Sequence, residues 1–84
     1  MVRQIKDLGI GESAEVVGYR AGNAAYRSRL LSMGLTKGTV LKLVKLAPLG
    51  DPVKLEVRGF NLTLRKQEAE ILEIRTVNTR GEAS

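Results

Sequence analysis

Hydrophobic and polar residues alternate with a period of two in the second half of the chain. Val53, Leu55 and Val57 are separated by charged residues, and after Gly59 three further apolar residues alternate with polar ones. Successive side chains of a strand point to opposite faces, so this alternation is typical of half-buried strands. Two such runs joined at a glycine predict a β-hairpin over residues 53–65.

Three other segments predict strands from their composition. Residues 14–19 contain two adjacent valines, which suit a pleated surface. Residues 39–46 carry leucine and valine on both faces, as in a strand that is covered or curled into a barrel. Near the C-terminus, Leu72 and Ile74 alternate with charged residues and predict a closing strand.

One segment has helical periodicity instead. Tyr26, Leu30 and Met33 recur at positions i, i+4 and i+7, which predicts an amphipathic helix of about three turns. Asn23 is the predicted N-cap of this helix. Gly34 stands where a helix ends in the left-handed conformation, with the next residue folded back onto the last turn.

Five short strands, one early helix and a short helical turn at residues 66–70 predict an all-β fold, a small barrel. Closure of the barrel removes the sheet edges that a domain of this size would otherwise have to protect. We assign the domain to residues 1–76. Residues 77–84 are polar and lack periodicity, so we expect a flexible tail there.

Apolar positions from the helix and from every predicted strand supply the predicted core. The core residues are Val16, Leu30, Met33, Leu35, Leu43, Val53, Leu55, Val57, Leu62, Leu64, Ala69, Leu72 and Ile74. A lead-in segment is expected to be anchored on this core by Ile5, Leu8 and Ile10.

The composition excludes several classes of function. The chain of 84 residues has room for one domain, and it contains neither cysteine nor histidine. Thiol chemistry and thiolate metal sites are therefore excluded, and the commonest general base and metal ligand are missing. We expect a protein that is not an enzyme, needs no cofactor, has no catalytic or metal site, and works by binding a partner.

The charge balance is basic, with 14 Lys and Arg against 9 Asp and Glu and a net charge of +5. Such a balance favours nucleic acid, an anionic membrane surface or an acidic protein as the partner. The N-terminal segment lacks the apolar run of a secretory signal, and no stretch approaches the ~20 apolar residues of a membrane span. We therefore expect a cytoplasmic protein without membrane insertion.

Three blocks of the chain resemble the FeoA family in order and spacing. They are RLLSMGLTKGT at residues 29–39, APLGDP at 47–52 and LRKQEA at 64–69, and the opening LGIGE at 8–12 fits the same pattern. The resemblance extends over residues 5–74. It implies an SH3-like barrel with a helical insertion after the first strand.

The resemblance to FeoA also implies a function. It implies a cytosolic accessory of ferrous iron uptake that docks on the cytosolic part of FeoB, a membrane transporter with a GTPase domain, and modulates iron transport. The same barrel resembles a C-terminal domain of some metal-dependent bacterial repressors. A small nucleic-acid-binding or repressor-like module is therefore the alternative, and self-association stays open, because the fold alone does not decide the function.

Carboxylates are the remaining candidates for binding iron directly. Glu68, Glu70 and Glu73 lie close together in the sequence, but ferrous iron favours imidazole together with carboxylate ligands. We therefore interpret them as part of a solvated charged surface. The glycine-containing turn at residues 34–39 leaves a helix and enters a strand, whereas a phosphate-binding loop opens a helix, so it predicts no nucleotide site.

Arg29 lies beside the apolar stripe of the predicted helix. One hypothesis is an arginine finger for a partner GTPase, but an ion pair or an ordinary surface arginine is the favoured interpretation. A groove for proline-rich peptides needs clustered aromatic residues. The chain has few of them, and Tyr26 and Phe60 are expected to be used in packing.

Basic residues on the outer face of the sheet are the candidates for binding nucleic acid: Lys42, Lys54, Arg58, Arg65 and Lys66. Binders of RNA or single strands usually add stacking aromatic residues, and none is expected on that face. We favour a solvated surface or one complementary to an acidic protein, and expect no nucleic acid.

The predicted partner-binding surface combines the helix with the turn at residues 47–52. Exposed apolar residues ringed by charge often mark a protein interface. The candidate residues are Arg29, Leu31, Leu35, Lys37, Pro48, Leu49 and Asp51. Capping of the barrel is an equally favoured explanation for the leucines and the proline.

Overall fold

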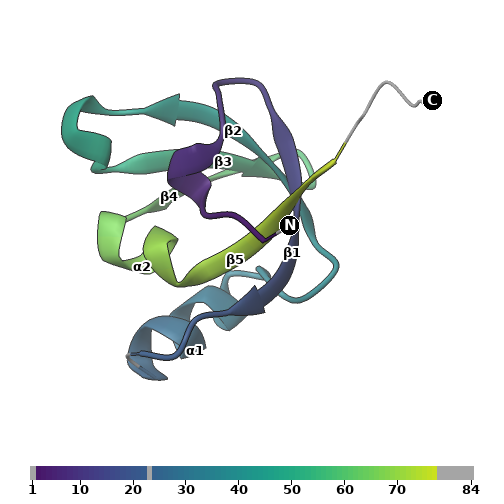
Figure 1. The fold of residues 1–84 in the computed structure, drawn as a ribbon, viewed down its shortest axis with the longest axis vertical. Helices are drawn as coiled ribbons and strands as arrows, with labels where there is room; N and C mark the ends of the chain where they lie inside the picture. Colours follow the sequence, from purple (N-terminus) through teal and green to yellow (C-terminus); the bar gives the residue numbers. More distant parts are fainter. Residues whose placement is uncertain (1, 23, 78–84) are drawn as a thin grey trace.

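The strands form one antiparallel sheet of five strands in the order β4-β3-β2-β1-β5 (Figure 1). The computed structural model describes residues 2–22 and 24–77. Along the chain, the elements are η1 (Ile5–Asp7), β1 (Ser13–Tyr19), α1 (Ala24–Ser32), β2 (Val40–Leu46), η2 (Pro48–Gly50), β3 (Val53–Val57), β4 (Phe60–Leu64), α2 (Lys66–Ile71) and β5 (Leu72–Val77), where η denotes a 3-10 helix. The predicted all-β class is confirmed, as are the hairpin, the early helix and the helical turn before the last strand.

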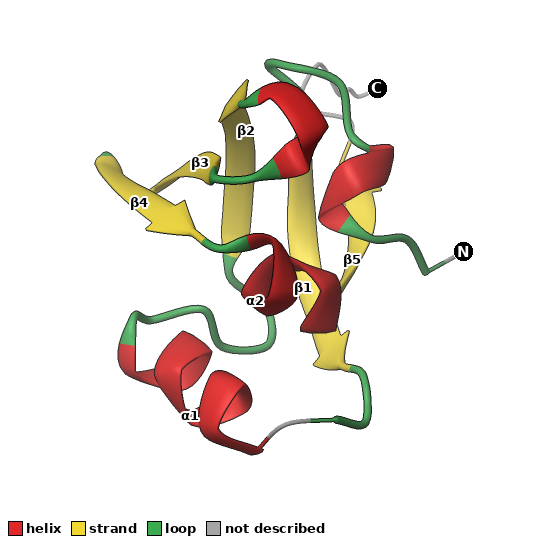
Figure 2. Cartoon of the chain, turned by 90° about the vertical axis from the view of Figure 1, so that its left-hand side faces the viewer, coloured by secondary structure: helices red, strands yellow, loops and turns green. Residues whose placement is uncertain are grey.

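All helical segments lie on one side of the curled sheet (Figure 2). On this side α1 lies at one end, η1 and η2 lie at the other end, and α2 lies between them. The sheet bends where its pairing register shifts, between Val16 and Gly18 on β1 and between Leu43 and Lys45 on β2. Such irregularities bend a strand and increase its local twist.

The predicted core is confirmed, with Met33 and Leu62 packed against it in partly buried positions. The prediction missed three buried apolar residues, Ala14, Leu41 and Ile71. Ala14 and Leu41 are in phase with the predicted Val16 and Leu43 on the inward faces of β1 and β2, and Ile71 ends α2 directly before the buried Leu72.

Two residues that were expected to pack are exposed instead. Ile5 and Leu8 anchor the lead-in segment as predicted, but Ile10 is 63% exposed because it lies in the turn that precedes β1. Phe60 is 72% exposed. It faces the same side as the buried Leu64 but lies next to the hairpin turn on β4, the outer strand of the sheet.

The C-terminus of α1 follows the predicted glycine cap. Gly34 adopts the left-handed conformation with φ +89°. Its N–H donates to the carbonyl oxygen of Leu31 at 3.0 Å, and the N–H of Leu35 donates to that of Leu30 at 3.0 Å. These two bonds satisfy carbonyls that the helix leaves without partners. The chain then turns back, so that Leu35 is buried in the core.

The last strand is longer than predicted. β5 continues to Val77, one residue past the domain boundary that the sequence suggested. The rest of the predicted tail, residues 78–84, and the predicted N-cap Asn23 lie outside the described residues.

The carboxylate of Glu68 is buried between the two α-helices. One oxygen accepts the backbone N–H of Arg65 at 2.9 Å, which caps the first turn of α2. The other forms an ion pair with Nε of Arg29 on α1 at 2.5 Å. The side chain of Glu68 is 4% exposed, so the interpretation of this residue as part of a solvated surface is wrong.

Tyr19 connects β1 to the segment after α1. Its hydroxyl donates to the carbonyl oxygen of Leu35 at 2.5 Å, and the guanidinium carbon of Arg27 lies 5.6 Å from the centre of its ring. Burial raises the pKa of the Tyr19 phenol above its ordinary value of 10.0, against the opposing effect of the Arg27 charge. The folded protein therefore keeps this proton at pH values where the unfolded chain releases it.

We predict that Tyr19→Phe lowers the free energy of unfolding by about 1 kcal/mol at neutral pH, because a hydrogen bond is lost. Because the folded-state pKa is raised, the contribution of Tyr19 is complete below pH 10.0 and is lost as the pH rises through the folded-state pKa. Urea unfolding of both proteins should therefore show a difference that shrinks above pH 10.0. A difference that stays constant or grows there contradicts this account.

We also predict that Arg29→Ala destabilises the protein by about 1–3 kcal/mol, because it leaves a buried carboxylate without its charged partner. In a cycle with Glu68→Gln, which keeps the capping oxygen, the two losses should not add. Arg75→Ala is the matched control, since the ion pair of Arg75 with Glu15 is more exposed and should contribute less than about 1 kcal/mol. Equal losses in the two arginine variants contradict the prediction.

Candidate functional site

A groove lies between η1, α2 and the turn that contains η2. It has a cavity volume of about 190 Å³. The buried residues Ile5, Val53 and Ala69 line its interior, and the more exposed Leu46 and Leu49 line its rim. The other lining residues are Gln4, Lys6, Gly50, Lys66 and Glu70. Cofactor pockets typically measure about 300–1,000 Å³, so the size of this groove fits an apolar side chain better than a nucleotide.

The turn beside the groove is held by its own hydrogen bonds. The N–H of Ala47 donates to the carbonyl oxygen of Pro52 at 3.2 Å, and the N–H of Gly50 donates to that of Ala47 at 2.9 Å. The carboxylate of Asp51 accepts the backbone N–H of Lys66 at 3.3 Å, which connects the turn to the start of α2. The turn therefore has a defined position relative to the groove.

Leu49 combines two unfavourable properties at the tip of this turn. Its side chain is 93% exposed, and its backbone is in the left-handed region with φ 68° and ψ 10°. That conformation costs a residue with a side chain roughly 1–2 kcal/mol, and glycine or asparagine would tolerate it better. Because Leu49 buries almost none of its own surface, folding gains little from a leucine here. Strained, exposed residues of this kind are candidates for a binding role.

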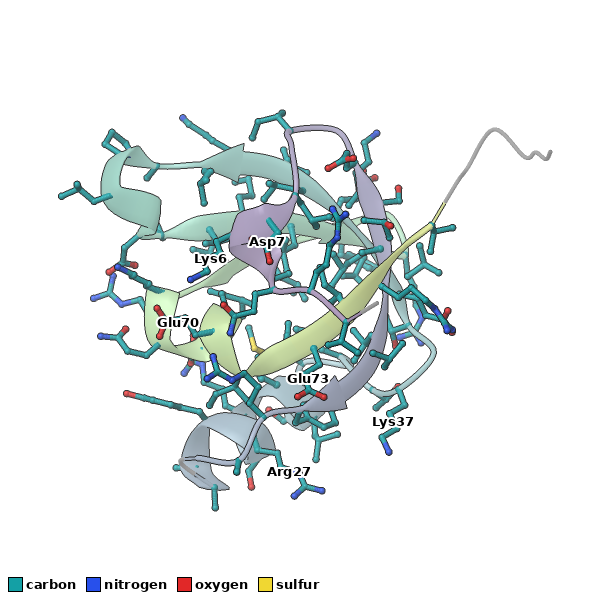
Figure 3. All side chains as sticks on the ribbon, viewed as in Figure 1. Lys6, Asp7, Arg27, Lys37, Glu70 and Glu73 are labelled. Atoms are coloured by element: carbon teal, nitrogen blue, oxygen red, sulfur yellow. The ribbon has the colours of Figure 1, made fainter. Side chains whose placement is uncertain are left out.

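Charged residues of both signs surround the groove. Figure 3 shows Lys6 and Asp7 of η1 and Glu70 of α2 on the same side of the molecule. The amide of Gln4 donates to the carbonyl oxygen of Glu70 at 3.1 Å and so joins the two walls. An apolar groove with a mixed polar rim is the usual anatomy of a protein-binding surface.

The structure divides the predicted partner-binding surface into separate parts. Pro48, Leu49 and Asp51 lie in the turn beside the groove, whereas α1 lies at the opposite end of the helical side (Figure 2). On α1, Leu31 is 40% exposed and Arg29 points to Glu68. The two regions do not form one continuous surface through the residues that the sequence suggested.

Two of the remaining candidates do not fit the groove. Leu35 is 0% exposed, so its prediction as a docking residue is wrong; the turn after Gly34 directs it into the core. Lys37 is exposed but lies on a different side of the molecule from Lys6 and Glu70 (Figure 3). They were grouped with the helix and the turn at residues 47–52 as one surface of exposed apolar residues ringed by charge, and the reversal after α1 separates them.

The ion-pair interpretation of Arg29 is confirmed by its contact with Glu68. Its guanidinium is engaged within the fold, although the side chain stays 59% exposed. Within residues 2–22 and 24–77, no cluster of three or more potential acidic, histidine or cysteine ligands is suited to hold a metal ion. Glu70 and Glu73 are partly exposed, whereas Glu68 is buried, so the three carboxylates do not share one environment.

The turn at residues 34–39 uses its polar groups internally. The N–H of Thr39 donates to the carbonyl oxygen of Thr36 at 3.0 Å, and the hydroxyl of Thr39 donates to the carbonyl oxygen of Gly34 at 3.2 Å. The N–H of Gly38 donates to the carbonyl oxygen of Val16 at 2.8 Å. A phosphate cradle needs N–H groups that are free to face an anion, so the prediction of no nucleotide site here agrees with this geometry.

Sequence reasoning missed the wall that η1 contributes to the groove. Lys6 was not singled out, and Leu46 was treated as part of a covered strand, although it is 37% exposed. The available signal was the lead-in segment itself, since Ile5 and Leu8 were expected to pack on the core. Their spacing of three residues fits a helical turn, which places Lys6 on the outside.

The predicted basic residues are spread over the outer sheet face and the ends of β4. Lys54 stands opposite Lys45 of β2, whereas Lys42 stands opposite Glu56. Two lysines directly opposite each other repel, so part of this face has unbalanced positive charge. None of the helices in the described part of the chain has the length and apolar character needed to cross a membrane.

The fold and the sequence were compared with known proteins. A family model described as "FeoA domain" matches residues 3–76. A fusion of Fe(2+) transport protein A with the Fe(2+) transporter FeoB from Porphyromonas gingivalis is 30% identical over 81 residues, which are 96% of this chain and 10% of the fusion protein. The chain thus spans about a tenth of that relative.

Two solved structures define the fold. The crystal structure of Stenotrophomonas maltophilia FeoA complexed with zinc, a prokaryotic SH3 domain protein, has a TM-score of 0.74 at 26% identity and covers 87% of this chain and 89% of that one. A manganese-dependent transcriptional repressor has a TM-score of 0.82 at 12% identity and covers 90% of this chain and 42% of that one, which shows a shared fold alone. The expected SH3-like barrel is confirmed, and the chain belongs to the FeoA family.

Proposed function

We propose that this protein is an accessory of ferrous iron uptake that docks on the cytosolic part of a FeoB-like membrane GTPase transporter and modulates its activity. The observation that carries this proposal is Leu49, an apolar side chain that is 93% exposed on a strained turn beside an apolar groove. The partner is suggested by the relative in which a related domain and the transporter FeoB form one chain.

In this proposal an apolar side chain of the transporter enters the groove while Leu49 and Leu46 become buried against the partner. Full burial of one leucine side chain contributes about 1.5–3 kcal/mol, so a contact of this size can anchor a weak, reversible complex. Lys6, Lys66 and Glu70 supply the polar rim that orients the partner.

Modulation follows from unequal binding to two transporter conformations. Docking shifts their populations by no more than the difference in affinity between them. A shift from about 1:99 to 99:1 requires roughly a 10⁴-fold difference, so a smaller preference gives a graded effect on uptake. The sign of the effect depends on which conformation presents the complementary apolar side chain.

A nucleic-acid-binding module is the rival function. Phe60 is exposed, contrary to the sequence-based expectation, and provides one aromatic surface. It faces the side of the sheet that carries the core, however, while Lys45 and Lys54 point to the outer face. Stacking and phosphate contacts would therefore not converge on one strand of nucleic acid.

We predict that Leu49→Asn weakens binding to the isolated cytosolic GTPase domain of the transporter at least about tenfold, since an apolar anchor is lost. Its free energy of unfolding should be unchanged or higher by up to about 1 kcal/mol, because asparagine tolerates the left-handed backbone. Calorimetric titration and urea unfolding measure the two effects.

Leu31→Gln is the matched control for Leu49→Asn. It replaces another exposed leucine with a polar residue, on α1 and away from the groove, and should leave the affinity within about twofold. Equal losses in both variants, or none in Leu49→Asn, would show that docking does not use the groove. A wild-type protein that binds an oligonucleotide with a steep log-linear salt dependence, and not the GTPase domain, would replace the proposal by the rival function.

A further inference from the structure

β4 is an outer strand whose second edge is unpaired in the described part of the chain, so the expectation that closure removes the sheet edges is wrong for this strand. It is hydrogen-bonded to β3 alone. The hairpin turn has φ 52° at Arg58 and 84° at Gly59, as in a type I′ turn, so Val57 and Phe60 are its hydrogen-bonded closing pair. Because bonded and non-bonded pairs alternate along an antiparallel ladder, the backbone groups of Asn61 and Thr63 face away from β3.

The β4 edge lacks the usual protection against pairing. Its five residues include no charged residue and no proline, and the register with β3 continues without a bulge. The other edge of the sheet is different. On β5, Ile74 exchanges two backbone hydrogen bonds with Arg3, at 2.7 and 2.9 Å, and Glu73 and Arg75 add charge.

The side chains of β4 differ between its two faces. Phe60 is 72% exposed and Leu62 is half-buried on the core side, whereas Asn61 and Thr63 point to the outer side. A strand added beside β4 would meet apolar neighbours on one face and polar neighbours on the other. Cross-strand neighbours of matching character favour pairing, so the geometry selects a segment that alternates apolar and polar residues.

Positive charge surrounds this neutral edge. Arg58 precedes β4, and Arg65 and Lys66 follow it. All three are exposed, and none forms an ion pair with a residue of the described ranges. Three acidic residues lie near this edge: Glu56 is opposite Asn61 on β3, Asp51 accepts the backbone N–H of Lys66, and Glu68 accepts the backbone N–H of Arg65 while its ion pair is with Arg29.

This charge pattern selects among possible occupants of the edge. Two copies paired antiparallel about Leu62 would place Arg58 of each copy near Lys66 of the other, and like charges opposite each other are unfavourable. A strand with acidic residues at both ends would instead complement Arg58 at one end and Arg65 with Lys66 at the other.

We propose that the β4 edge binds an extended, acidic-flanked segment of a partner protein as an additional antiparallel strand. Backbone hydrogen bonds to Asn61 and Thr63 provide the affinity, and the terminal cations select the partner. This surface shares Lys66 with the rim of the groove at Leu49 but no other residue, and its occupancy does not depend on the docking described above.

The test uses the full chain, labelled with ¹⁵N, and a blocked peptide of alternating valine and threonine with two glutamates at each end. We expect shifts centred on the amides of Asn61 and Thr63 and slower hydrogen exchange of both. The same peptide with lysines in place of the glutamates should bind at least about tenfold more weakly. Leu49→Asn should bind the acidic peptide as the wild type does, which separates this result from the groove.

Thr63→Pro removes the backbone N–H that faces away from β3. Proline is tolerated on an edge strand at such a position, so the variant should weaken peptide binding at least about tenfold. Thr63→Ala keeps the N–H and should bind within about threefold of wild type. If the proline variant fails to fold, the comparison of the two peptides still decides. Equal affinity for both peptides, shifts centred elsewhere, or peptide-independent dimers through β4 would overturn the proposal.

Discussion

The packing of α1 against α2 depends on one buried carboxylate. Glu68 lies between α1 and α2, where it caps the backbone of Arg65 and pairs with Arg29. Burial of a lone carboxylate is costly, so this position is stable only while both contacts exist. Because α2 provides Ala69 to the interior of the groove and Glu70 to its wall, the shape of the groove depends on the same ion pair.

Much of the fold follows from local signals in the sequence. The hairpin and α1 were predicted because their periodicity and their glycine turns reflect interactions within a few residues of each other. The burial of Glu68 and the exposure of Phe60 were not predictable in this way. Both depend on where the core ends and on which element packs against the residue, and neither is encoded in the neighbouring positions.

The candidate site shows the same division. The turn of residues 47–52 was recognised from its prolines and glycine, and Leu49 was among the predicted contacts. Leu35 was wrongly included because the left-handed Gly34 reverses the chain and turns it inward. The η1 wall was missed because a single turn of 3-10 helix has no periodicity long enough to detect.

The barrel is shared between the FeoA family and a metal-dependent repressor, so the function depends on its surface rather than its core. The most direct measurement is a chemical-shift titration of the labelled protein with the isolated cytosolic GTPase domain of the transporter. The account predicts shifts in η1, in residues 46–50 and in α2, with little change around Leu31. Shifts centred on α1, or no response at any amide, would contradict it.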